Sequence, residues 1–476
     1  MTLTEKQSTH VDAGLRRGVM GGAELGAQAI ANIAPSAVLA FTAAAIFVSA
    51  GNGTLLSLLL ATIVILSVGW CVAVFARKNA SAGSIYTYVS KSLGPTAAYI
   101  AGLALIIGCW GVTAGSLGGG VSYASDLLHA FGIPTAGVIG FIVLTVVLGV
   151  VTTFFTIQGI QISARVSFVL EIASVLIILT LFITSLVVSG PAAWDPKQFT
   201  FDGAPPQGVA AGMVLGVLGF AGFSSADALG REAKNPYKTI PRVIMWSVVG
   251  IGLIYLFGAY TQIAVLGDKL ATSANPLQDI ADKIGMPGWY TMFLLFGVAA
   301  SFSAVCIAAL NVLGRIVYVM GKEGVVHESL GRTHRKHLTP HRVLIFGGAL
   351  SVVVNIILLL AGGHPMEIVV WLDTYGVYGY MVAYALVAFA CAVYVRKMGM
   401  PRALVTVCAT ISVLAMTYIF FANVWPVPAF PLNLLPYLFA ATMLVGIGWF
   451  IHVRRTRPEV LSRIGNTETD SLSGIG

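Results

Sequence analysis

The sequence is short of charged residues. Asp, Glu, Lys and Arg make up 10% of its 476 positions, whereas 57% are hydrophobic. Soluble globular domains carry charge at about 25% of their positions, so this composition excludes them and indicates an integral membrane protein. The apolar runs also lack the polar–apolar alternation of barrel strands, which excludes a transmembrane β-barrel.

The motifs of enzymes and pumps are missing as well. No G-x-x-x-x-G-K-[ST] loop is present to bind ATP phosphates, which argues against a primary pump. None of the eight histidines falls deep in an apolar run, and no His or carboxylate cluster suggests a membrane hydrolase. The five cysteines show no metal-ligand spacing. We therefore expect no enzyme, cofactor or metal site. Transport is the leading class, and a membrane sensor on a transporter scaffold is the alternative.

Apolar runs long enough to cross a bilayer recur along most of the chain. A helix needs roughly 20 residues to span a hydrocarbon core about 30 Å thick. The sequence predicts an all-α membrane protein with twelve transmembrane helices, at 23–49, 54–76, 95–123, 136–156, 162–189, 208–233, 239–266, 289–320, 343–361, 366–394, 402–423 and 433–453.

The basic residues give the orientation. If the first helix runs outward, every Lys and Arg except Lys197, Lys269 and Lys283 falls in a cytoplasmic segment or helix end, as the positive-inside rule requires. The net charge of +8 then reflects orientation rather than a nucleic-acid partner. No apolar signal region precedes the first helix. We expect cytoplasmic tails at 1–22 and 454–476 and one domain, 23–453, in the cytoplasmic membrane.

The sixth predicted helix changes character halfway. It is apolar to Leu218, and Gly219, Phe220, Ala221, Gly222 and Phe223 then precede a polar stretch. Ser224 and Asp227 are spaced as a capping box, which starts helices. Asp227 and Arg231 are spaced i, i+4, which suits a short helix. The pattern predicts a helix, an unwound segment and a second short helix.

The first predicted helix is interrupted in the same way. Pro35 lies near its centre, where proline removes a backbone donor and pushes the preceding residue, Ala34, away from helical angles. Helices one and six correspond if 23–189 and 208–394 form an inverted repeat, and paired interruptions point to a binding site near the membrane midplane. Free peptide groups at the breaks suit a ligand with both an ammonium and a carboxylate group.

Three stretches resemble the amino acid–polyamine–organocation (APC) superfamily of permeases. "GFAGFSSADALGREAKNPYKTIPRVI" is similar to its sixth-helix signature, "ASAGSIYTYVSKSLGP" to its loop after the second helix, and "NVLGRIVYVMGKEGVVHESLGRTHRKHLTPHR" to its eighth-helix end. The resemblance implies a five-plus-five inverted-repeat (LeuT-like) fold with discontinuous helices 1 and 6 and two extra helices at 402–453. It also implies alternating access and a small-molecule amino acid or amine as the substrate.

The resemblance places substrate binding at the two breaks. The family's first-helix element falls on Ile33, Ala34, Pro35 and Ser36, and its sixth-helix break falls on the segment from Gly219, Phe220, Ala221, Gly222 and Phe223 to Ser224. Phe220 or Phe223 would close over the substrate. Pro35 has no N–H to donate to a substrate carboxylate, which weakens the case for an α-amino acid. Ser224 stands where many family members have Asp or Glu, which weakens the case for a polyamine. Amino acid and amine therefore both stay open as substrates.

The coupling ion also has two candidates. Ser174 occupies the fifth-helix position where proton-coupled and exchanging members often carry a lysine, so Glu171 is the candidate proton carrier. An ionised acid at this depth costs on the order of 2.5–3.5 kcal/mol, so such a residue usually faces the protein interior. Sodium bound by first-helix carbonyls with Ser301 and Ser303 is the alternative. Glu171 could also have a purely structural role, with its carboxyl group satisfied by a neighbouring helix.

Several further residues have weaker indications. The aromatic residues Trp110, Phe302, Trp371 and Tyr375 are candidates for gating or lining the pocket. Asp126 and Asp373 are expected near outer helix ends, in contact with solvent. A short outer helix, begun after a proline, is expected at 275–285 as a lid or connector.

Overall fold

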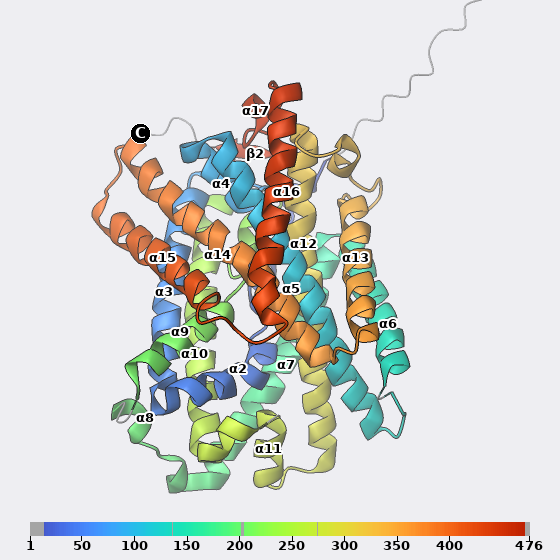
Figure 1. The fold of residues 1–476 in the computed structure, drawn as a ribbon, viewed down its shortest axis with the longest axis vertical. Coiled ribbons are helices and arrows are strands. Elements are labelled where there is room, and N and C mark those ends of the chain that lie inside the picture. Colours follow the sequence, from blue (N-terminus) through green and yellow to red (C-terminus); the bar gives the residue numbers. More distant parts are fainter. Residues whose placement is uncertain (1–13, 136, 201–203, 274, 472–476) are drawn as a thin grey trace, which may run out of the picture.

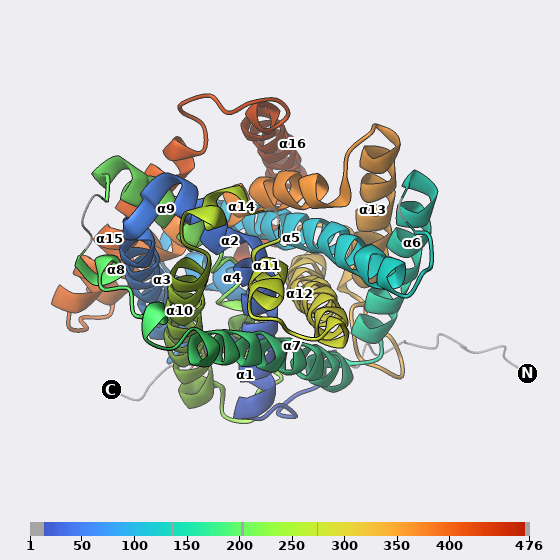
Figure 2. The ribbon, with the colours of Figure 1, turned by 90° about the horizontal axis from the view of Figure 1, so that it is seen from below.

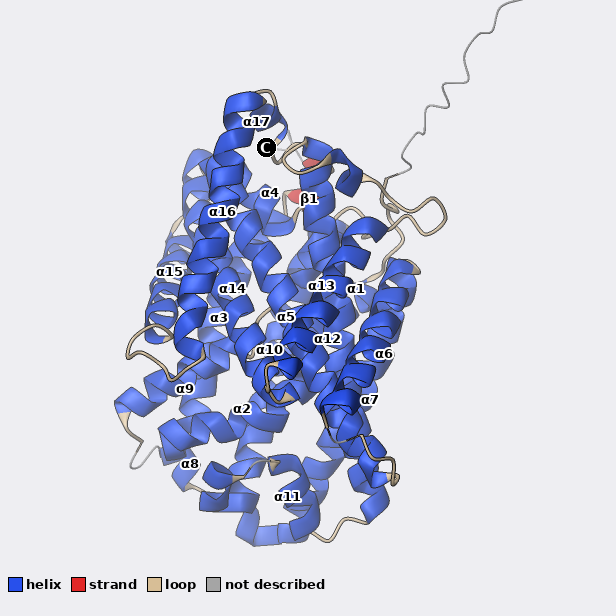
Figure 3. Ribbon diagram, turned by 45° about the vertical axis from the view of Figure 1, so that its right-hand side comes forward, coloured by secondary structure: helices blue, strands red, loops and turns tan. Residues whose placement is uncertain are grey.

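The computed structural model describes residues 14–135, 137–200, 204–273 and 275–471. The outermost parts of the two expected tails, residues 1–13 and 472–476, lie outside the described residues, as does residue 136 at the start of the fourth expected helix. The described chain is mostly helical, with two short strands (Figure 3).

Within these ranges, ten helical segments are long and apolar enough to cross a membrane. The helices are α1 (Gly22–Ile33), α2 (Pro35–Ala50), α3 (Thr54–Ala76), α4 (Ser84–Leu93), α5 (Pro95–Ala130), α6 (Val138–Ile157), α7 (Ile160–Ser189), α8 (Lys197–Thr200), α9 (Pro206–Leu218), α10 (Pro236–Leu266), α11 (Pro276–Lys283), α12 (Gly288–Glu323), α13 (His341–Leu360), α14 (Pro365–Lys397), α15 (Ala403–Ala422), α16 (Leu435–Thr456) and α17 (Val460–Arg463). The strands are β1 (Asn79–Ser81) and β2 (Thr469–Ser471).

Short 3₁₀ helices connect several of these elements. They are η1 (Gly51–Gly53), η2 (Gly190–Ala193), η3 (Ser225–Leu229), η4 (Gly267–Thr272), η5 (Glu328–Gly331) and η6 (Leu432–Leu434).

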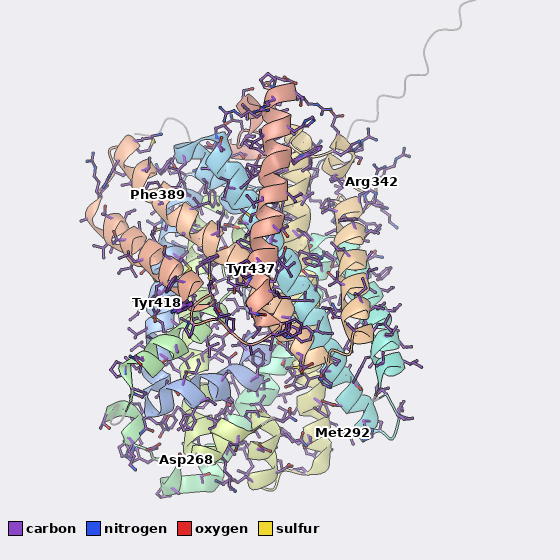
Figure 4. All side chains as sticks on the ribbon, in the orientation of Figure 1. Asp268, Met292, Arg342, Phe389, Tyr418 and Tyr437 are labelled. Carbon is purple, nitrogen blue, oxygen red and sulfur yellow. The ribbon has the colours of Figure 1, made fainter. Side chains whose placement is uncertain are left out.

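The helical bundle has two distinct ends. We call the upper end in Figure 1 the tail end; it carries α4, α17 and the strands. The opposite end, which we call the loop end, carries α8 and α11. Figure 4 labels Arg342 toward the tail end and Asp268 at the loop end. Lys197 in α8, Lys269 in η4 and Lys283 in α11 belong to elements of the loop end.

Helices α5 and α12 form the centre of the bundle. Most of their residues are buried, whereas only a minority of the residues of α6, α15 and α16 are buried. Figure 2 shows α5 and α12 inside the ring of helices, with α6 and α13 paired at one edge and α16 at another. The outer helices expose large apolar side chains such as Val150, Leu444 and Val445, which is the surface that lipid requires.

Glycines let α5 and α14 approach each other closely. A Cβ atom on Gly111 would lie 2.5 Å from the Gly376 Cα atom, and one on Gly376 would lie 2.9 Å from the Gly108 carbonyl oxygen. Small residues commonly mediate packing between membrane helices because backbone contacts replace side-chain contacts. This packing fixes the part of α14 that reaches the central cavity described below.

The sixth predicted helix is the main correction to the helix boundaries. The α-helical part, α9, ends at Leu218, and the expected second short helix is only the five-residue 3₁₀ helix η3. Ser224 precedes η3 but its side chain makes no capping hydrogen bond. Asp227 accepts a hydrogen bond from Ser84 instead, and Arg231 pairs with Glu468. Tertiary partners have therefore replaced the local pairs that the spacing suggested.

Candidate functional site

The first interruption lies at Ala34, between α1 and α2. Ala34 adopts a left-handed conformation with φ 51° and ψ 65°, and its N–H donates to the Ile30 carbonyl at 3.0 Å. Pro35 disfavours right-handed helical angles at the residue before it, and it then serves as the first residue of α2, where its missing N–H costs nothing. The break therefore ends one helix and starts another in the middle of the chain's first apolar segment.

The second interruption follows α9. Gly222 has φ 83°, which glycine adopts without strain. Tyr255 donates its hydroxyl hydrogen to the Gly219 carbonyl at 2.7 Å, and the Gly222 N–H donates to the Tyr384 hydroxyl oxygen at 3.1 Å. These tyrosines come from α10 and α14, so neighbouring helices satisfy part of the unwound backbone.

The two interruptions contact each other. Asn32, in the last turn of α1, donates from Nδ2 to the Gly222 carbonyl at 3.1 Å. Ser225 donates to the Gln28 carbonyl at 3.1 Å. Oδ1 of Asn32 and Oε1 of Gln28 are buried and make no hydrogen bond within the described part of the chain. The breaks thus form one polar unit inside an apolar bundle.

A cavity of about 260 Å³ lies beside this unit. Residues from α1, α2, α5, α9, α12 and α14 and from both breaks line it, and most of them are apolar. Along α2 the lining runs from the break to Ala45. A small molecule here would touch both interruptions.

Five of the residues expected to bind or gate the substrate line this cavity: Ile33, Ala34, Gly219, Ala221 and Phe302. The ring of Phe302 is buried and packs on Tyr123, with 5.9 Å between ring centroids. Aromatic contact with α5 therefore fixes one wall of the cavity.

The other residues expected at the breaks are buried but do not line the cavity: Pro35, Ser36, Phe220, Gly222, Phe223 and Ser224. Phe220 packs on Tyr255 with ring centroids 5.0 Å apart, and Phe223 packs on Tyr384 at 5.1 Å. The two rings thus support the unwound segment in this structure rather than closing over the cavity.

Trp110 and Tyr375, the other expected gating residues, line a second cavity of about 510 Å³ together with Trp371. Their rings meet edge to face, with centroids 6.2 Å apart, and Tyr375 donates to the Thr442 hydroxyl at 2.9 Å. This second cavity lies against α13 and α16, away from both interruptions.

Glu171 lies fully buried in α7, within a hydrogen-bonded chain that reaches the first break. Ser301, in α12, donates to Glu171 Oε2 at 2.7 Å and accepts from the Ala37 N–H at 3.3 Å. Ala37 is in the first turn of α2 and lines the cavity. The carboxylate is therefore one serine away from the cavity wall.

Ser174 and Ser303 do not join this chain. The Ser174 hydroxyl is buried without a hydrogen bond among the residues described. Ser303 donates to the Ala299 carbonyl of its own helix at 2.9 Å and lies near Gly120 of α5. Ser301 and Ser303 point toward different helices, so the structure does not bring them to a single site.

Asp373 is a lining residue that sequence reasoning missed. It was expected at a solvated helix end, but it lines the central cavity from α14. Val369 and Val377 line the cavity too, and their i−4 and i+4 spacing from Asp373 gives them a shared helix face. This spacing was the signal available in the sequence. It shows that the three residues share one face of the helix, but it does not show which other helix or cavity that face contacts.

The tail end is closed by polar contacts. Arg315 is fully buried and donates to both carboxylate oxygens of Glu232, at 2.6 and 3.1 Å. Tyr86 donates to Glu323. Strand β2 pairs antiparallel with β1, and Arg231 binds Glu468 just before it.

No group of three His, Cys, Asp or Glu side chains within the described ranges is placed to bind a metal ion. Interrupted helices around a small central cavity, in a bundle with an apolar exterior, are features of a multi-pass membrane permease. Residues 27–450 match the family model described as amino acid permease, so the chain belongs to this family, within the APC superfamily.

Individual relatives are distant. The branched-chain amino acid permease BcaP of Bacillus subtilis is 26% identical over 370 residues, which cover 75% of this chain and 77% of the relative. An uncharacterized transporter of Mycobacterium tuberculosis is 26% identical over 400 residues, 83% of each chain. Cationic amino acid transporter 4 of Mus musculus is 25% identical over 323 residues, 63% of this chain and 49% of the relative. These relatives are transporters rather than enzymes.

Proposed function

We propose that the protein is a secondary active transporter that moves an amino acid or related amine across the cytoplasmic membrane by alternating access. The proposal includes twelve spans in a five-plus-five LeuT-like repeat with two further helices, and both termini in the cytoplasm. The tail end would then face the cytoplasm, in keeping with the three lysines of α8, η4 and α11 being at the opposite end.

The observation that carries the proposal is the cavity at the two interrupted helices. Ala34 and Gly219, one from each break, both line it. Paired interruptions in the two halves of a transporter mark the substrate site, because half-helix ends offer peptide groups to a charged ligand. The names of the relatives support an amino acid as the substrate: branched-chain in the Bacillus subtilis permease and cationic in the mouse protein.

The contacts at the tail end support alternating access. The buried Arg315–Glu232 pair joins α12 to the segment after η3, so the cytoplasmic side is closed. The lining runs along α2 from the break to Ala45, so the proposed access route leads from the loop end. Opening to the cytoplasm would require these contacts to separate.

Proton coupling through Glu171 is the better supported ion mechanism. Its hydrogen bond to Ser301 connects its carboxylate to the start of α2, which lines the cavity. A change in the charge of Glu171 would alter a contact that positions this half-helix. Sodium binding by Ser301 and Ser303 together has less support, because the two hydroxyls point toward different helices.

Uptake by reconstituted protein tests the proposal. Proteoliposomes would be offered labelled aliphatic, cationic and aromatic amino acids and their decarboxylated amines, with a proton gradient, a sodium gradient or internal substrate imposed separately. We expect accumulation with the proton gradient. Uptake driven only by the sodium gradient would indicate sodium coupling instead of proton coupling, and uptake driven only by internal substrate would indicate exchange. Binding without any flux would favour a sensor.

Glu171→Gln tests the coupling residue. This change keeps the size of the side chain and its acceptor for Ser301 but removes its titration, so gradient-driven accumulation should fall to the level of equilibration. Asp126→Asn, an exposed acid on α5, is the control. Undiminished proton-driven accumulation by Glu171→Gln would exclude Glu171 as the carrier.

A further inference from the structure

The wall of the central cavity carries a single ionisable side chain among the described residues, that of Asp373. The other polar side chains of the lining are Asn32, Thr42, Ser116 and Thr374, and the rest are apolar. No Lys, Arg or His lines the cavity within the part of the chain described. The acid therefore has no protein cation beside it on this wall.

The position of Asp373 is built into the packing of α5 and α14. A Cβ atom on Gly115 would lie 2.9 Å from the Asp373 Cγ atom and 3.0 Å from its backbone nitrogen. Glycine at this position leaves room for the carboxylate of this cavity-lining residue to lie against α5. Its Oδ1 atom is buried and makes no hydrogen bond to any described residue.

A carboxylate in apolar surroundings is costly unless a cation or hydrogen-bond donors compensate it. Oδ1 has no hydrogen-bond donor among the described residues, and no Lys, Arg or His among them lines the cavity. A cation that enters the cavity is therefore a group that could compensate this acid. Val369 and Val377 flank Asp373 on the same face, and Phe302 lies on another wall. These side chains suit a methylene chain that leads to the acid.

We propose that Asp373 binds a positively charged group on the side chain of the substrate, so that the transporter selects amino acids with a distal ammonium or guanidinium group. This inference rests on the proposed function. The α-ammonium and α-carboxylate of the ligand would lie at the two helix breaks, its methylene groups would contact Val369 and Phe302, and its terminal cation would reach Asp373. A hydrogen bond to a charged group contributes more than one between neutral groups, so this contact would decide selectivity.

Lysine and norleucine test the contact in the wild-type protein. The two ligands share the amino acid head and a four-carbon chain, and norleucine lacks the terminal amine. In proteoliposomes, lysine should be taken up or should compete with an affinity about 10- to 100-fold higher than norleucine, the range expected for a hydrogen bond to a charged group.

Asp373→Asn tests the residue. This variant should lose the advantage of lysine over norleucine, and a thermal unfolding midpoint like that of the wild type would show that it folds. Asp126→Asn removes an exposed acid from α5 and should leave the ratio unchanged. Asp373→Glu keeps the charge and should retain a preference for lysine.

The outcomes separate the two proposals. If the wild-type protein takes up norleucine and its affinity for lysine is equal to or weaker than its affinity for norleucine, the role of Asp373 is overturned. The proposed transport function would still stand. An unchanged lysine-to-norleucine ratio in Asp373→Asn would also overturn it. If Asp373→Asn does not fold, the wild-type ratio decides alone. Absence of uptake of every amino acid and amine would instead contradict the proposed function.

Discussion

Gly222→Ala is the substitution that most directly strains the joint between the two interrupted helices. A Cβ atom at this position would lie 2.8 Å from the Asn32 Cγ atom and 3.1 Å from its carbonyl oxygen. The residue also has φ 83°, a left-handed conformation that costs a residue with a Cβ atom about 1–2 kcal/mol. Overpacking adds about 1–3 kcal/mol, so we expect a loss of about 2–5 kcal/mol.

Strain at Gly222 can be relieved only by moving Asn32 or the unwound segment. Either movement breaks the Asn32–Gly222 hydrogen bond, which joins the two breaks. We therefore expect both a lower thermal unfolding midpoint, followed by intrinsic fluorescence in detergent, and reduced uptake in proteoliposomes.

Gly250→Ala is the matched control for this change. Gly250 lies within α10, and a Cβ atom there would meet no heavy atom of the described residues within 4 Å. Alanine should therefore be tolerated at this position and slightly favoured by helix propensity. Wild-type stability and uptake in Gly222→Ala would refute the argument that the two breaks form one packed unit.

Two further predictions concern the closed tail end. Glu232→Gln leaves the buried Arg315 with its charge uncompensated, so the protein should lose about 3–5 kcal/mol of stability. Adding Arg315→Met to this variant should recover much of the loss. A Glu232→Gln variant as stable as the wild type would contradict the role of the pair. Deleting residues 466–476 removes β2 from β1, so a thiol in Ser81→Cys should become accessible to a membrane-impermeant maleimide added on the side of the tail end. Labelling as slow as in the intact chain would show that β2 does not cover this position.

The positions of the helices could be predicted because apolar length is a local property. Residues 54–76 were expected to form a helix and do so as α3. The break at Ala34 followed from Pro35 in the same local way. The conformation of residues 224–235 could not be predicted from the local sequence. Asp227 and Arg231 in this segment bind Ser84 and Glu468, which are far away in the sequence.

The cavity lining was only partly predictable for the same reason. Glycines and a proline mark a broken helix, but they do not say which side of the break faces the cavity, and Phe220 and Phe223 in fact pack on tyrosines of α10 and α14. Asp373 was missed because its place depends on Gly115 of another helix. No spacing within α14 carries that information.

Protection of a single cysteine tests the central claim, that substrate binds in the cavity between the two interrupted helices. The five native cysteines are free and four of them are buried, so a background with all five replaced can carry Ala221→Cys in the central cavity or Leu438→Cys in the second cavity. The best transported amino acid of the uptake panel should slow thiol labelling of Ala221→Cys severalfold and leave Leu438→Cys unchanged. Equal labelling of Ala221→Cys with and without substrate, or protection of Leu438→Cys instead, would contradict the account.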